Sequence, residues 1–188
     1  MSTVTGFSGQ YVSLAVALRL ALDDYRACGA EPRGKRKSIV EAIEGPRARA
    51  INVVLLNAAL CEATINTVLS LQFSPAMWAS VDRLPTIKKW TAIPQRIWPG
   101  CEIPASDALH KELAALFACR NAIMHPVPEV HRGADESQSG NVKDWRTLDD
   151  KLVTGSHDLV LRLLQHLAKF DFSIKLHHDS IAEHLNRR

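Results

Sequence analysis

Apolar residues recur at every third or fourth position through much of this chain, the spacing that places side chains on one face of an α-helix. The first such run predicts a helix over 10–27, with Gly29 after it as a stop. Later runs predict a long helix over 46–71, a helix that ends near residue 125, and further helices from about 148 and over 159–170. The pattern therefore predicts an all-α, up-and-down helical bundle of about four to five main helices with short accessory helices.

The predicted helix over 46–71 is apolar on most of its faces, and Pro46 suits its first turn. A helix that is apolar nearly all round belongs in the middle of a bundle. Glu62 and Asn66 are its polar exceptions, and they share a face because they are four positions apart. A buried carboxylate needs a partner. Glu62 is thus expected either to orient Arg120 or His125 from a facing helix, or to make a purely structural pairing.

The segment 73–105 has a different composition, with five of the nine prolines and three of the four tryptophans. It predicts one or two short helices joined by turns. In one interpretation Lys88, Lys89 and Arg96 line a path for RNA, and Trp90 or Trp98 stacks on a base. In the other, which we favour, the tryptophans pack in or near the core.

A chain of 188 residues suits a single helical domain, and we expect its core to span about 10–170, with a polar loop over 126–143 and a C-terminal extension over 171–188. The hydrophobic content of 46% is ordinary for a globular protein. The net charge of +3 mildly favours a polyanionic partner.

The four cysteines form no C-x-x-C pair, which argues against a zinc ribbon or a thioredoxin-like site. Arg19, Asp23 and Asp24 interrupt the first apolar run, so a signal peptide is not expected. No uninterrupted apolar stretch is long enough to cross a bilayer. These features predict a cytoplasmic protein with no membrane partner.

The most informative stretch is 113–126, an apolar helix that ends in Arg120, Asn121 and His125 directly before Pro126. Proline disfavours helical backbone at the residue before it, so the helix should end near His125. Ser106 or Asp107 is suited to cap its start. Arg120 and His125 are about 140° apart around the helix, from ~100° per residue, so they can converge only on a shared ligand such as a phosphate.

The run from Arg120 to His125 resembles the Arg-x4–6-His motif of the HEPN superfamily, in which a polar residue such as Asn121 often follows the arginine. HEPN proteins are small helical bundles, and many are metal-independent ribonucleases of toxin–antitoxin, phage-defence and RNA-processing systems. The looser resemblance spans about 45–170. It implies catalysis by Arg120, His125 and Asn121 at the cleft of a homodimer, with a possible cognate antitoxin protein. Glu62 and Asn66, from their shared face on the long helix, are expected to support these residues.

Two alternatives stand beside this interpretation. Arg and His near a helix C-terminus also interact well with the helix dipole and its free carbonyls, so the motif can be a simple helix stop. The second alternative is a catalytically silent helical bundle that binds RNA, a nucleotide or a partner protein.

The basic segment 31–37 is either an RNA-phosphate contact through Lys35, Arg36 and Lys37 or, as we favour, a solvated connection. The C-terminal histidines have no Asp, Glu or Cys set beside them at the usual ligand spacing, so no metal is predicted for His177, His178 and His184. No cofactor-binding motif is present in the sequence either, and no cofactor is predicted.

Overall fold

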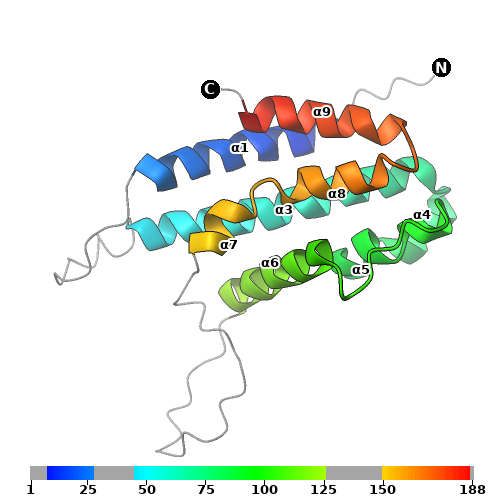
Figure 1. Cartoon of the computed structure of the whole chain (residues 1–188), viewed down its shortest axis with the longest axis horizontal. Coiled ribbons are helices and arrows are strands. Elements are labelled where there is room, and N and C mark those ends of the chain that lie inside the picture. The colour runs from blue at the N-terminus through cyan, green and yellow to red at the C-terminus, as the bar shows by residue number, and fades with distance from the viewer. Residues whose placement is uncertain (1–7, 28–44, 126–149, 187–188) are drawn as a thin grey trace, which may run out of the picture.

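The computed structural model describes residues 8–27, 45–125 and 150–186, and every regular element in these ranges is a helix (Figure 1). The long helices lie roughly side by side along one axis. The all-α bundle predicted from the apolar spacing is therefore confirmed. The polar loop predicted over 126–143 lies outside the described residues.

Helix α3 (Pro46–Gln72) is the centre of the bundle, and α1, α6 and α8 pack against it. Pro46 follows the extended Gly45 and occupies the first turn, where a missing N–H costs no helical hydrogen bond. The prediction for this helix is correct to within one residue. Its segment Ala48–Gln72 is long enough to span a bilayer and contains an 18-residue stretch with a mean hydropathy of 1.5, of which 61% is buried inside the bundle. Core helices and membrane-spanning helices share this property.

Helix α1 (Ser8–Ala27) packs on α3, and α9 (Ser173–Asn186) packs on α1 and α8. Ile174 and Ile181 of α9 are buried, and because they are seven positions apart they lie on one face. The core therefore continues past residue 170, and the expectation of an appended C-terminal extension is corrected to a packed helix. The apolar period was hard to see there because histidines and charged residues surround both isoleucines.

Helix α6 (Ala108–Met124) packs on α3 and α8. It begins at Asp107, whose carboxylate accepts a hydrogen bond from the Leu109 N–H at 2.8 Å, as a helix cap should. Helix α7 (Asp150–Gly155) leads through a turn into α8 (Leu159–Leu167). One face of α8 is fully buried and consists of Leu159, Val160, Leu163, Leu164 and Leu167.

The segment between α3 and α6 holds α4 (Pro75–Val81), α5 (Thr86–Thr91) and the 3-10 helix η1 (Pro94–Arg96). Trp90 is completely buried, and its indole N–H donates to the carbonyl of Cys61 at 3.0 Å. Trp98 is also buried, as is Lys89. The interpretation in which Trp90 or Trp98 stacks on RNA bases and Lys89 lines an RNA path is therefore wrong, and the packing interpretation holds.

Candidate functional site

The candidate site lies at the C-terminal end of α6, where the helix ends at Met124, with His125 as its C-cap, directly before Pro126. The last helical hydrogen bond runs from the N–H of His125 to the carbonyl of Asn121 at 2.9 Å. His125 itself leaves the helical conformation, with φ −129° and ψ 66°. This end point agrees with the one predicted from Pro126, which cannot follow helical backbone without a clash.

Arg120 continues the apolar stripe of α6 at the point where that stripe leaves the core. It is four positions after Leu116 and seven after Leu113, and both leucines are fully buried. Arg120 is half-buried, and its Nη1 donates to Oδ1 of the exposed Asn121 at 3.0 Å. The guanidinium of Arg120 therefore lies at the edge of the core. Its hydrogen bond to Asn121 limits the orientations that the Arg120 side chain can take.

His125 is exposed, and its ring makes no hydrogen bond with any residue that the structure describes. The structure brings Arg120 and Asn121 together, and His125 lies about one turn farther along, with neither ring nitrogen bonded to a described residue. Such a ring can exchange a proton with a ligand that approaches the helix end.

Glu62 and Asn66 of α3 form no hydrogen bond or ion pair with Arg120, Asn121 or His125. Glu62 is half-buried and forms no hydrogen bond or ion pair within the described part of the chain. Asn66 accepts a hydrogen bond from the ammonium of Lys89 at 2.8 Å. The supporting role of Glu62 and Asn66 stays a prediction, and Asn66 has a structural partner that the sequence did not reveal.

The basic residues Lys35, Arg36 and Lys37 lie outside the described residues, so their contact with RNA also stays a prediction. Among residues 8–27, 45–125 and 150–186, no three side chains of the His, Cys, Asp and Glu types come together as metal ligands would. His177 is paired with Tyr11, and His178 with Asp179.

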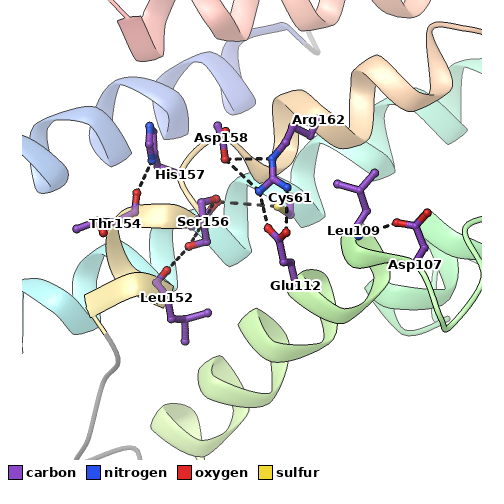
Figure 2. A network of polar contacts seen from close by, with 11 residues as sticks. Cys61, Asp107, Leu109, Glu112, Leu152, Thr154, Ser156, His157, Asp158 and Arg162 are labelled. Carbon is purple, nitrogen blue, oxygen red and sulfur yellow. Dashed lines mark hydrogen bonds and ion pairs between the residues drawn. The ribbon is translucent and has the colours of Figure 1, made fainter.

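An ion-pair network across α6 and α8 is the main polar feature that sequence reasoning missed. The guanidinium of Arg162 on α8 donates to both carboxylate oxygens of Glu112 on α6, and also to Asp158 one turn earlier (Figure 2). The hydrogen bonds to Glu112 raise the pKa of Arg162 above its ordinary value. Burial of the guanidinium opposes this rise, and the negative charge of Asp158 adds to it. The sequence does indicate the ion pair between Asp158 and Arg162, because opposite charges four positions apart face each other on a helix. No local pattern pointed to Glu112, 50 positions away.

Comparison with known proteins adds no further constraint on this site, since no family model, no curated protein and no solved structure matches the chain.

Proposed function

We propose that this protein is a metal-independent endoribonuclease of the HEPN type that uses Arg120, Asn121 and His125 at the end of α6. The observation that carries the proposal is the arrangement of this motif. Asn121 is bonded to the guanidinium of Arg120, and His125 stands exposed with its ring available to a ligand. A purely structural helix stop does not require an exposed His ring, whereas acid–base catalysis does.

The reaction uses the nucleophile that RNA carries itself. A base takes the proton of a 2′-hydroxyl, the 2′-oxygen bonds to the adjacent phosphorus, and the bond from phosphorus to the 5′-oxygen breaks. An acid then protonates the leaving 5′-oxygen, so the products are a 2′,3′-cyclic phosphate and a 5′-hydroxyl. His125 has the side chain to act as the base or the acid. Arg120 remains charged and can bind two phosphate oxygens as negative charge develops.

One histidine cannot supply the acid and the base in the same step. The proposal therefore includes a homodimer in which two copies of α6 contribute their motifs to one cleft, as the resemblance implies. A toxin or phage-defence role, with a cognate antitoxin protein that holds the enzyme inactive, is the biological setting that fits such an RNase.

The test is loss of RNA cleavage in His125→Ala, measured in EDTA with the purified full-length protein and total RNA. Removing a general acid or base lowers the cleavage rate by about 10²–10⁴-fold. Because the His125 side chain is exposed and makes no hydrogen bond to a described residue, the melting temperature should stay within about 1 °C of the parent's.

Arg120→Ala, measured beside it, should also lose cleavage. Asp107→Ala is the structural control, since it removes the cap at the opposite end of α6 and should lower the melting temperature without a matching loss of cleavage. A parent protein that cleaves no RNA, together with a His125→Ala variant that melts a few degrees lower, would identify the motif as a helix stop.

A silent bundle that binds RNA or a partner protein is the second candidate. It is favoured by one observation, which is that no carboxylate or carbonyl within the described residues orients the His125 ring. General bases are usually held by such a group. In this case Arg120→Ala should weaken binding of RNA, while the parent protein leaves that RNA intact in EDTA.

A further inference from the structure

A pocket of about 420 Å³ opens between α6 and α8, well away from the end of α6 that carries the motif. Of the described residues that line it, Arg162, Gln165 and His166 are on α8 and lie on the side of that helix with fewer apolar residues. Lys169 follows in the turn directly after α8. Among the described residues, the lining consists of hydrogen-bonding side chains and one apolar side chain, with no carboxylate: Leu109, Arg162, Gln165, His166 and Lys169. This composition fits an anion.

Arg162 is held in place with one donor to spare. A guanidinium has five N–H groups, and the bonds from Arg162 to Glu112 and Asp158 use one on Nε, one on Nη1 and both on Nη2. The second N–H of Nη1 has no partner among the described residues. The two carboxylates more than offset the charge of Arg162, so the exposed Lys169 is the lining cation whose charge is not paired with a carboxylate of the described residues.

His166 is also fixed before any ligand arrives. Its Nε2 lies 3.0 Å from the carbonyl of Cys101, and because a carbonyl only accepts, Nε2 carries the proton. The ring also packs against Phe170, with centroids 5.9 Å apart. Pro99 and Gly100 form the tight turn that positions Cys101, with Gly100 at φ 85° and the Cys101 N–H bonded to the carbonyl of Trp98.

We infer that this pocket binds a phosphate group, with Lys169, Gln165 and the free N–H of Arg162 as donors and Leu109 as an apolar wall beside it. The ion pairs of Arg162 fix its N–H before a phosphate arrives, whereas the exposed side chains of Lys169 and Gln165 are ordered on binding. The volume is also large enough for the sugar that carries the phosphate.

The ligand that we assign is a phosphodiester of the RNA strand, and this part rests on the proposed function. Leu109 and Arg120 are 11 positions apart on α6, which is about 16 Å along the axis and within about 20° of the same face. A single strand of a few nucleotides spans such a distance. The pocket would then hold a phosphate some nucleotides away from the bond that is cleaved, as basic grooves do when they follow an RNA backbone.

The experiment compares Lys169→Gln with Lys175→Gln in the full-length protein. Both lysines are exposed and both changes remove one charge, but Lys175 is on α9, over the ring of Phe172 and outside the pocket. The probes are 5′-adenosine monophosphate and a fluorescent single-stranded RNA, the second in a His125→Ala background so that it stays intact. Lys169→Gln should weaken binding of both probes about tenfold, since it removes one charge-assisted hydrogen bond. Lys175→Gln should change either affinity less than twofold.

Gln165→Leu is a further test variant that changes no charge, and it should weaken the binding of both probes severalfold. Equal affinities for adenosine monophosphate in Lys169→Gln and Lys175→Gln, or no binding by the parent, overturn the phosphate pocket. If Lys169→Gln weakens only the nucleotide, the RNA assignment is overturned. A parent protein that shows these effects but cleaves no RNA overturns the proposed ribonuclease and leaves the phosphate pocket supported.

Discussion

Lys89 is a charged residue in the core, with a side chain only 2% exposed. Its ammonium donates to Asn66 Oδ1 at 2.8 Å and to the carbonyl of Asp82 at 2.6 Å, and it lies 5.4 Å from the centre of the Trp78 ring. These contacts explain how a lysine can be buried, because each buried donor needs an acceptor. They also join α4 and α5 to α3.

We expect Lys89→Met to lower the free energy of unfolding by about 2–4 kcal/mol, because methionine fills a similar volume but donates no hydrogen bond to Asn66 or Asp82. Urea denaturation followed by circular dichroism measures the effect. Lys88→Met is the matched control, since Lys88 is the exposed neighbour and should change stability by less than about 0.5 kcal/mol. Equal stability of the two variants would show that Lys89 does not anchor this segment.

At the scale of single residues, sequence reasoning worked where the signal was local. The end of α6 at His125 follows from Pro126 alone, and the cap at Asp107 follows from its side chain and position. Pairing through space was not predictable, because nothing near Lys89 in the sequence indicates Asn66, and nothing near Arg162 indicates Glu112. Such pairs depend on which faces of two helices meet, and that depends on the whole packing.

At the scale of elements, Asn57 joins the middle of α3 to the turn between α7 and α8. It is completely buried, and its Nδ2 donates to the carbonyl oxygen of Ser156 at 2.6 Å and to the Ser156 hydroxyl at 2.8 Å. The same carbonyl receives the N–H of Leu159, the first residue of α8. The start of α8 is thus bound to the central helix by one amide side chain.

We expect Asn57→Ala to lower the free energy of unfolding by about 2–3 kcal/mol, since it removes two buried hydrogen bonds and leaves a small cavity. Asn52→Ala on the exposed side of the same helix should be neutral or slightly stabilising, because alanine favours helix more than asparagine does. Both values come from the same urea titration. A loss of similar size in the two variants would mean that the contact with Ser156 contributes little.

The interface of α1 and α9 contains a histidine that should make stability depend on pH. The hydroxyl of the buried Tyr11 lies 3.1 Å from Nδ1 of His177. Burial lowers the pKa of His177 below its ordinary value of 6.5. Below about pH 6.5 the unfolded chain therefore binds a proton more readily than the folded chain, and the free energy of unfolding falls as the pH falls.

The measurement is urea denaturation at about pH 8 and about pH 5, a range in which histidine changes charge. The parent should lose stability toward the lower pH, and His177→Gln should lose less because it has no proton to gain at this position. His178→Gln, which changes the neighbouring histidine beside Asp179, should retain the slope of the parent. A slope in His177→Gln as steep as the parent's would exclude His177 as its origin.

Among whole helices, the bounds of α1 and α3 were predicted within about two residues because long apolar periods define them. The packing of α9 was not predicted. Ile174 and Ile181 are its buried apolar residues, and the polar residues around them leave no clear apolar period in the sequence. The candidate site was likewise predictable only in part. Its position at a helix end follows from the sequence, while its surroundings depend on packing and on partners outside one chain.

For the whole molecule, the proposed chemistry requires a second copy of the chain. The end of α6 offers one exposed histidine, and no second histidine of the described residues is bonded to Arg120, Asn121 or His125. A phosphoryl transfer that needs an acid and a base together can use the same histidine from each of two chains. The monomer of 20.8 kDa should then be inactive by itself.

We expect light scattering at micromolar concentration to give about twice the mass of 20.8 kDa, and we expect cleavage per chain to fall as the protein is diluted below the concentration at which the dimer dissociates. A dilution series of RNA cleavage beside one of molar mass tests both. The two curves should share a midpoint, because the active site exists only in the dimer. Lys175→Gln serves as the control for surface charge and should leave the midpoint unchanged. A protein that remains a monomer while its cleavage per chain stays constant on dilution would show that a single α6 end is sufficient, and the second proton-transfer group would then have to come from the same chain.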